Sequence, residues 1–244
     1  MRRPLPLDPQ RLDFPPPRHA LREPNGLLAF GGDLSSQRLL AAYRHGIFPW
    51  LGEGDPILWW SPDPRCVFRT GALHVPQRLI RSLRRGGWTL SIDTAFDRVI
   101  DACAAPRAST TGTWITPAMR AAYRQLHELG HAHSFEVWDG ARLVGGLYGV
   151  AVGDLFAGES MFSAASGGSR AALLTAARLL ARWGWPLIDA QVANPHLLRM
   201  GAIELPRPAF LEQVAALGAN PGRPGRWTAL LPWHEARDLV ALQG

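Results

Sequence analysis

Three polar side chains interrupt two segments that are otherwise apolar enough to form buried strands. Glu159 lies within residues 158–163, and Asp189 and Gln191 lie within residues 187–192. A carboxylate on a buried strand costs free energy unless it has a partner or a chemical use, and such clusters are candidates for functional sites. We therefore predict that these three are catalytic residues. For Glu159, a structural salt bridge is the alternative to a site for a cationic substrate group.

The expected direction of these side chains follows from the alternation of a strand. The first segment should place Phe156, Gly158, Ser160 and Phe162 on one face, and Ala157, Glu159, Met161 and Ser163 on the other. Asp189 and Gln191 are two residues apart and should share a face. If the two strands are neighbours, the three polar side chains line one cleft. Asn194 follows them and either contacts a substrate or caps the next helix.

Residues 127–131 match the H-E-x-x-H pattern, in which two histidines of one helix bind zinc and the glutamate is the base. Gly130 lies inside the pattern and a strand is predicted to begin near residue 134. The helix should therefore end before His131, and the two histidines should not share a face. We predict no metal site and histidines that interact with a helix dipole. A zinc protease is the metal-dependent alternative.

The basic residues indicate a polyanionic partner. The net charge is +6 and all 26 basic residues are Arg, whose planar guanidinium binds phosphate in a bidentate manner. Helical spacing predicts one stripe of phosphate contacts, which comprises Arg78, Arg81, Arg84 and Arg85. A solvated helix face, or a codon bias toward Arg, gives the same pattern. Trp50 and Trp114 lie near predicted loops, where an indole can stack on a nucleobase.

An α/β (α+β) fold must position these residues. Helices are predicted at 36–45, 77–85, 94–103, 117–130, 169–183, 195–200 and after Pro208, and strands at 134–138, 143–152, 155–162 and 187–192. The predicted order is that of acetyltransferase-type N-acyltransferases: a helix, three meandering strands, a long helix, a strand and a helix. Residues 1–65 should form a small, irregular N-terminal domain, and residues 66–244 a mixed sheet flanked by helices.

Composition restricts the class of protein. No apolar run approaches the roughly 18 residues of a membrane span, and no apolar segment follows the basic N-terminus as in a signal peptide. Cys66 and Cys103 are not in a CxxC pattern, so we expect reduced thiols. These features predict a cytoplasmic protein, which we expect to be a monomer without membrane partners. The loop 164–170 does not match the pyrophosphate loop of coenzyme A acetyltransferases, which remain the second enzymatic alternative.

Several segments resemble the leucyl/phenylalanyl-tRNA–protein transferase family. They are residues 23–28, 31–34, 46–50, 59–65, 112–116, 127–134, 158–163 and 189–194. The resemblance implies a small N-terminal domain and an acetyltransferase-like C-terminal domain. It implies transfer of Leu or Phe, with Met as a further donor, from aminoacyl-tRNA to the N-terminal Arg or Lys of proteins, which marks them for degradation. It implies no metal and no other cofactor.

The resemblance also implies roles for particular residues. Gln191 would hold the attacking amine, Asp189 would orient that amide, and Glu159 would contact a cationic acceptor or orient its neighbours. Substrate contacts are implied for Trp50, Trp114, Tyr43 and Tyr123 around the terminal adenosine, for Phe156, Gly158 and Met161 around the donor side chain, and for Asn194. The arginine stripe would contact tRNA. An amide is not basic, so positioning the amine is the role that chemistry favours for Gln191. A tRNA-binding module without catalysis is the last alternative.

Overall fold

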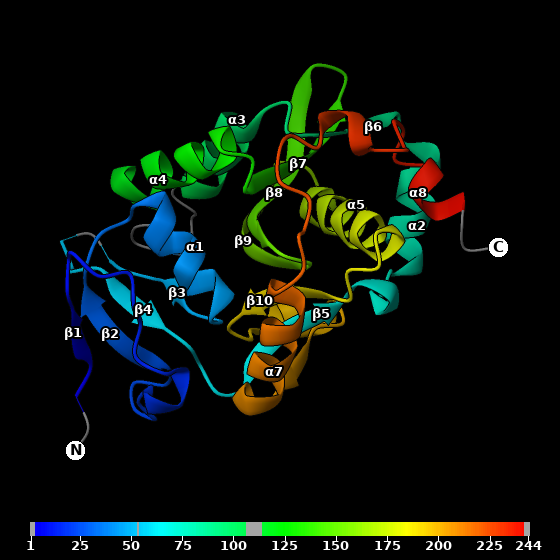
Figure 1. The fold of residues 1–244 in the computed structure, drawn as a ribbon. Coiled ribbons are helices and arrows are strands. Elements are labelled where there is room, and N and C mark those ends of the chain that lie inside the picture. Colours follow the sequence, from blue (N-terminus) through cyan, green and yellow to red (C-terminus); the bar gives the residue numbers. More distant parts are fainter. Residues whose placement is uncertain (1–2, 53, 106–113, 242–244) are drawn as a thin grey trace.

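The strands form two sheets in the computed structural model, which describes residues 3–52, 54–105 and 114–241 (Figure 1). The smaller sheet has the order β1-β2-β4-β3, with β1 (Leu5–Leu7), β2 (Leu27–Gly31), β3 (Phe48–Pro49) and β4 (Leu58–Trp60). The larger sheet has the order β11-β5-β10-β9-β8-β7-β6, with β5 (Arg65–Arg69), β6 (Trp88–Ile92), β7 (Ala132–Asp139), β8 (Arg142–Val152), β9 (Leu155–Ser163), β10 (Leu187–Gln191) and β11 (Ile203–Leu205). In it, β9 and β10 run parallel, and the other described neighbours are antiparallel. The predicted mixed α/β class is confirmed.

Helices cover both faces of the larger sheet. They are α1 (Ser36–Arg44), α2 (Gln77–Arg85), α3 (Phe96–Ala104), α4 (Pro117–Glu128), α5 (Gly168–Arg182), α6 (Pro195–Arg199), α7 (Arg207–Gly218) and α8 (Asp238–Ala241). The long helix α5 lies on one face with α2 and α8, whereas α1, α3 and α4 lie on the opposite face (Figure 1). The sheet therefore separates two apolar cores. None of the helices in the described residues combines the length and apolar character needed to cross a membrane.

Local signals explain why most helices were predictable. The Thr116 side chain accepts a hydrogen bond from the backbone N–H of Met119, which is the N-cap expected before α4. Asn194 caps α6 in the same way. Helix α4 ends at Glu128, and Gly130 has a φ of 75°, a conformation that suits glycine at a helix end. The predicted helices and the four predicted strands are confirmed, with ends that differ by at most two residues.

The expectation of an irregular N-terminal region was wrong, because residues 5–60 contain a four-stranded sheet. Its strands have two to five residues and contain prolines and aromatic side chains, so they lack the alternation that identifies a longer strand. Strands β5, β6 and β11 of the larger sheet were also missed. The indole N–H of Trp59 donates to the carbonyl of Gly31, so this buried tryptophan belongs to the core of the small sheet.

A β-bulge in the larger sheet decides which residues face the site. Tyr148 of β8 pairs with Ser160 and Gly149 pairs with Gly158, so Glu159 is left between the two pairs. A bulge inserts one residue into one strand and redirects the side chains beyond it. At this point a Cβ on Gly149 would lie 2.2 Å from the carbonyl oxygen of Ala157, which only glycine avoids. The bulge places the Glu159 side chain among residues of α1 and α4.

Candidate active site

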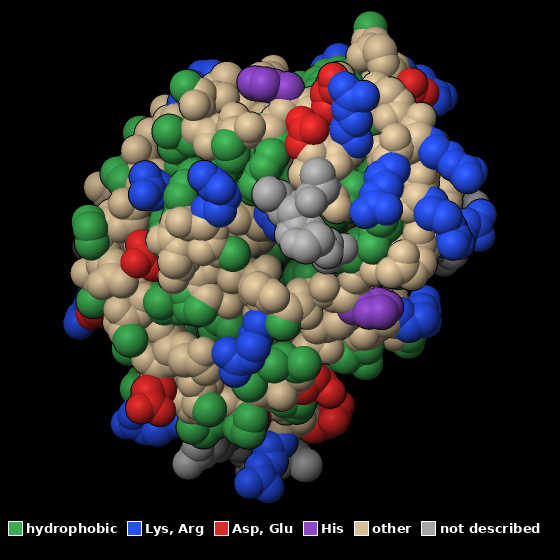
Figure 2. Space-filling view, turned by 90° about the vertical axis from the view of Figure 1, so that its right-hand side faces the viewer, with side chains coloured by type: hydrophobic (Ala, Val, Ile, Leu, Met, Phe, Trp, Pro, Cys, Tyr) green, Lys and Arg blue, Asp and Glu red, His purple; other side chains and the backbone are tan. Residues whose placement is uncertain are grey.

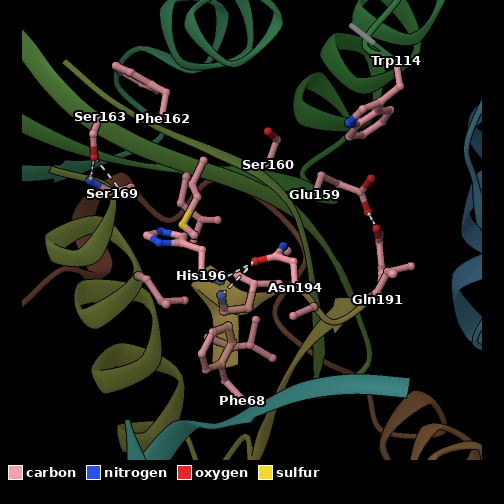
Figure 3. A pocket seen from close by; sticks show the side chains of 18 of the residues that line it. Phe68, Trp114, Glu159, Ser160, Phe162, Ser163, Ser169, Gln191, Asn194 and His196 are labelled. Atoms are coloured by element: carbon pink, nitrogen blue, oxygen red, sulfur yellow. Dashed lines mark hydrogen bonds between the residues drawn. The ribbon is translucent and has the colours of Figure 1, made fainter. Parts of the chain in front are cut away.

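A pocket of about 910 Å³ lies where β9 and β10 diverge (Figure 3). The two strands pair only at Ile188 with Phe156 and at Asp189 with Ala157, within the described residues. Beyond these pairs, residues 158–164 from β9 and residues 190–194 from the end of β10 line opposite sides of the opening. Parallel strands that separate after a short pairing therefore create the site.

Glu159 lies at one end of the pocket and is only 8% exposed. Its carboxyl group accepts hydrogen bonds from the Tyr43 hydroxyl at 2.8 Å, the Tyr123 hydroxyl at 2.9 Å and the Gln191 amide Nε2 at 2.8 Å. Burial raises the pKa of Glu159 to about 7, although the three donors act in the opposite direction. Burial therefore favours the neutral form of this carboxyl group.

Asp189 has a different environment, because an ion pair holds it behind the pocket. Both carboxylate oxygens accept from Arg65, at 2.8 Å from Nε and 2.6 Å from the terminal nitrogen, and both side chains are almost fully buried. The Arg65 guanidinium also donates to the carbonyl of Gly46 and lies between the rings of Phe48 and Phe210, 4.7 and 4.6 Å from their centroids. The buried charge of Arg65 is therefore neutralised by Asp189 and is also in contact with a carbonyl oxygen and two aromatic rings.

Gln191 forms a hydrogen bond with each of the two carboxyl groups. Its backbone N–H donates to Oδ1 of Asp189 at 2.9 Å, while its side-chain amide donates to Glu159. Gln191 has a φ of 62°, a conformation that costs a non-glycine residue free energy and recurs at functional sites. Asp189 thus holds the backbone of Gln191, whose side chain points toward Glu159 at the pocket (Figure 3).

Two expectations about these strands need correction. Asp189 was expected to line the cleft beside Gln191, but it is not among the residues that line the pocket, and a register irregularity separates the two. Met161 was expected to share a face with Glu159, but it packs with Phe156 on the α5 side, whereas Phe162 packs on the opposite side. The bulge at Glu159 reverses the alternation, because it adds one residue between the two halves of β9.

Seven of the predicted site residues line the pocket. They are Trp50, Trp114, Gly158, Glu159, Met161, Gln191 and Asn194. Tyr43, Tyr123 and Phe156 do not line it and are 3%, 0% and 0% exposed. The two tyrosines contact Glu159 from behind, and Phe156 packs edge-on against Phe135. The structure therefore places these three aromatic side chains behind the pocket wall, and their contact with a substrate stays a prediction.

The remaining pocket wall is mainly apolar. Leu147, Met161, Leu173 and Ile188 are contributed by β8, β9, α5 and β10, and Phe68 of β5 is also in contact with the pocket. At the end away from Glu159, the Ser163 hydroxyl donates to that of Ser169 at 2.9 Å (Figure 3). Asn194 accepts two backbone N–H groups of α6, so its side-chain oxygen is engaged as a cap. A cavity with an apolar wall and few polar groups suits an apolar side chain.

Two tryptophans lie at the pocket with access to solvent. Trp50 is 43% exposed, and the indole N–H of Trp60 donates to its carbonyl. Trp114 lies on the same side of the pocket as Glu159 and Gln191 (Figure 3). Gly112 and Thr113, which belong to the same sequence segment, lie outside the described residues. The two indoles can stack on a planar ring that lies between the solvent and the pair of Glu159 and Gln191.

The arginine stripe on α2 forms a separate basic surface. Arg78, Arg81 and Arg85 line a shallow groove of about 420 Å³ with Ser82, and Arg84 is exposed beside it. We call these three arginines the arginine groove. Leu79, Ile80 and Leu83 are buried beneath it, so the helix has one apolar and one basic face. Arginine side chains gather on the face of the molecule that carries α2 and α8 (Figure 2).

The histidines of the H-E-x-x-H pattern have structural contacts. Helix α4 ends before His131, as predicted. The His127 ring stacks on Phe96 at 4.3 Å and its Nδ1 contacts the carbonyl of Ala132. Burial lowers the pKa of His131, as does the nearby Arg44. Among residues 3–52, 54–105 and 114–241, no three His, Cys, Asp or Glu side chains are grouped as a metal site requires.

Arg65 is a charged residue of the site that was not predicted from the sequence. It had a recognisable signal, since a cation directly precedes the apolar run Cys66, Val67 and Phe68, where only a paired charge is tolerated. The same argument identified Asp189, but the pairing of the two was not proposed. Both cysteines are buried, and neither forms a disulfide within the described part of the chain.

Comparisons with known proteins agree along most of the chain. A family model described as leucyl/phenylalanyl-tRNA protein transferase matches residues 67–215, and the model of the N-terminal domain of the same family matches residues 32–63. A leucyl/phenylalanyl-tRNA–protein transferase of Xanthomonas axonopodis pv. citri is 61% identical over 93% of this chain and 91% of its own length. That of Xylella fastidiosa is 56% identical over 95% and 96%. A GCN5-related N-acetyltransferase from Kribbella flavida has 14% identity and a TM-score of 0.33, over 78% of this chain and 65% of its own, which is too low for an argument.

Proposed function

The chain belongs to the leucyl/phenylalanyl-tRNA–protein transferase family, and we propose that the pocket between β9 and β10 is where its reaction takes place. The chain is an aminoacyltransferase that transfers Leu or Phe from aminoacyl-tRNA to the N-terminal Arg or Lys of acceptor proteins. This modification marks the acceptor for degradation. The proposal for the site rests on one observation, an apolar pocket that ends at the hydrogen-bonded pair of Glu159 and Gln191.

The donor side chain occupies the apolar part of the pocket in this proposal. Leu147, Met161, Leu173 and Ile188 provide aliphatic contacts without a buried charge. Each buried methylene contributes about 0.8 kcal/mol, so leucine and phenylalanine gain affinity there, and methionine is a third donor with an unbranched side chain. A donor branched at Cβ places a methyl group close to the backbone of β9 and is expected to react more slowly.

Gln191 positions the amine of the acceptor. Its Nε2 donates to Glu159, so the carbonyl oxygen of the same amide points away from Glu159 and can accept an N–H of the amine. An α-amine has a pKa of about 7.7–8.0, so part of it is neutral and nucleophilic without a strong base. Holding it against the ester carbonyl supplies rate acceleration by proximity.

The reaction itself exchanges an ester for a peptide bond. The amine nitrogen attacks the aminoacyl carbonyl carbon and forms the C–N bond. The bond from that carbon to the ribose oxygen of the terminal adenosine breaks. The proton lost by nitrogen balances the proton gained by the leaving ribose oxygen. The amide of Gln191 guides the nucleophile and does not take its proton.

The nucleic-acid part of the donor has two proposed contacts. Trp50 and Trp114 stack on the terminal adenosine at the opening of the pocket, because both line it and Trp50 is substantially exposed. The arginine groove, with the adjacent Arg84, binds phosphates farther along the tRNA. Asn194 stays a candidate for a weak substrate contact through the amide nitrogen, because its oxygen caps α6.

Four predicted residues have supporting roles in this proposal. Asp189 positions the main chain of Gln191, Tyr43 and Tyr123 position Glu159, and Phe156 supports the pocket floor. Each acts through another residue, because none of them lines the pocket. Glu159 touches the pocket and remains, with Gln191, a candidate catalytic residue.

The same proposal includes the domain boundary and the location. We divide the chain into residues 1–65 and 66–244, which is supported by the separate sheets and by family matches that end at 63 and resume at 67. A cytoplasmic location follows from the donor, because aminoacyl-tRNA is made and used there.

A transfer assay tests the proposed function. Labelled Leu-tRNA is incubated with the protein and a peptide that begins with Arg, with no added cofactor. We expect labelled peptide, and no product from the same peptide with an acetylated N-terminus. Correctly charged tRNA that stays intact in the presence of folded protein would contradict the function. Leu-tRNA and Val-tRNA compared in the same assay test the donor pocket, because valine is branched at Cβ.

A further inference from the structure

Three oxygen-bearing side chains form a closed ring behind the pocket. The hydroxyls of Tyr43 and Tyr123 are 2.6 Å apart. The Tyr43 hydroxyl is 2.8 Å from Oε1 of Glu159, and the Tyr123 hydroxyl is 2.9 Å from Oε2. The residues come from α1, α4 and β9 and are all buried. We call this group the oxygen ring.

The oxygen ring contains three contacts and needs three protons. Each of the distances is that of a hydrogen bond, which requires one proton between two oxygens. Each tyrosine hydroxyl supplies one proton, and an ionised carboxylate supplies none. If Tyr43 and Tyr123 both donate to Glu159, no proton is left for the contact between their own oxygens. A protonated Glu159 supplies the third proton and completes the ring.

With three protons, the hydrogen bonds of the ring run in one direction. The Oε2–H group of Glu159 donates to Tyr123, Tyr123 donates to Tyr43, and Tyr43 donates to Oε1 of Glu159. Every oxygen then has a partner, and bonds arranged head to tail strengthen one another in a buried setting. Oε1 is the carbonyl oxygen in this arrangement, and it also accepts the amide of Gln191.

We propose that Glu159 carries a proton in the resting protein and that Tyr43 and Tyr123 are positioning residues that share this proton with it. The three contacts of the oxygen ring require this proton whatever reaction takes place in the pocket.

The surroundings of Glu159 agree with a neutral acid. The negative charge of Asp189 on β10 acts on Glu159, and Asp189 is itself paired with Arg65 of β5. Tyr148 of β8 is buried nearby with a hydroxyl that has no hydrogen-bond partner in the described part of the chain. No cation forms an ion pair with Glu159 in that part of the chain. Burial is the main cause that raises the pKa of Glu159.

A neutral oxygen ring has a consequence for the reaction, which rests on the proposed function. The carbonyl oxygen of Glu159 fixes the amide of Gln191 with its own oxygen turned toward the pocket. The ring presents no negative charge to the arriving amine. The amine is therefore not retained as an unreactive ammonium ion beside Gln191.

Infrared difference spectroscopy on the resting full-length protein tests the proposal directly. We expect a carboxylic acid C=O band at about pH 6 that disappears at about pH 9, where the acid is ionised. Glu159→Gln should abolish this band, whereas Glu204→Gln, at an exposed glutamate of β11, should retain it. Spectra of wild type and Glu159→Gln that are identical at both pH values would overturn the proposal.

The tyrosine variants test the sharing of the proton. Tyr43→Phe and Tyr123→Phe should each shift the acid band to higher frequency, because the acid loses a hydrogen bond. Tyr148→Phe is the matched control, since it removes an equally buried hydroxyl that is outside the ring. A band unmoved in the first two variants, or shifted equally in the control, would overturn the role of the tyrosines. An inactive protein with an intact band would count against the proposed function alone.

Discussion

Two buried carboxylates lie on neighbouring strands and have opposite surroundings. Asp189 on β10 has a full positive charge against it, with both oxygens bound by Arg65. Glu159 on β9 has only neutral hydrogen-bond partners, which are two tyrosine hydroxyls and one amide. An ion pair fixes a charge, whereas neutral donors leave a buried carboxyl group able to change its protonation state near neutral pH. Asp189 therefore suits a structural task, and Glu159 suits a chemical one.

The largest expected effect is the loss of the ion pair on the Asp189 side. Arg65→Ala leaves Asp189 buried without its cation, and breaking a buried pair in this way costs about 3–5 kcal/mol. Urea unfolding of wild type and variant measures the difference. Arg124→Ala is the control, because its partners Asp97 and Asp101 are exposed and such pairs contribute about 0–1 kcal/mol. Equal losses of unfolding free energy in the two variants would show that the buried pair of Arg65 and Asp189 contributes no more than an exposed pair.

The next effect is a dependence of the free energy of unfolding on pH, which Glu159 causes. The pKa of Glu159 rises from 4.5 to about 7 on folding, mainly because of burial. Between these values the native state binds more protons than the unfolded state, so the free energy of unfolding falls as pH rises. The contribution is present in full below about pH 4.5 and is lost above about pH 7, a change of about 3 kcal/mol at 1.4 kcal/mol per pKa unit.

The comparison of wild type with Glu159→Gln isolates this contribution. Glutamine does not ionise in this range, so its unfolding free energy should lack the decrease. Buried His133, whose pKa is lowered mainly by burial, changes stability in the opposite direction as pH falls, but it does so equally in both proteins. Parallel curves for the two proteins between about pH 5 and pH 8 would show that Glu159 is ionised throughout.

The smallest effect should come from a surface that is separate from both carboxylates. Replacement of Arg78, Arg81 and Arg85 by Ala should raise KM for aminoacyl-tRNA at low salt and reduce the slope of log KM against log salt by about 2–3, roughly one unit for each lost phosphate contact. The pH dependence of unfolding should stay as in wild type. An unchanged salt slope would show that the arginine groove does not contact the phosphates of tRNA.

The sequence predicts the helices and the central strands well because their signals are local. The N-cap Thr116 and the terminating Gly130 lie within a few residues of the helix that they delimit. The short strands of the small sheet have no such signal, since they are held by pairing between segments up to 33 residues apart in sequence, such as Leu5 with Ala29 and Leu27 with Trp60. The bulge at Glu159 also depends on the facing strand, so simple alternation assigned Met161 and Phe162 to the wrong faces.

The candidate site was predictable to the extent that chemistry reveals a buried polar residue. Glu159, Asp189 and Gln191 are conspicuous in apolar segments, whereas their partners are not. Tyr43 is 116 residues from Glu159 and Arg65 is 124 residues from Asp189, and no local pattern predicts contacts over such separations. Tyr43 and Tyr123 were identified through the family resemblance, but as substrate contacts. The structure adds their contacts with Glu159, which the sequence did not predict.

The kcat of amino-acid transfer by Gln191→Ala tests directly whether Gln191 positions the amine. We expect it to fall by about a hundredfold, because the nucleophile loses its positioning group, while the variant remains folded. Gln125→Ala, at an exposed glutamine of α4, should transfer Leu at the wild-type rate. A Gln191→Ala protein that is as fast as wild type would contradict the claim that this corner of the pocket positions the amine.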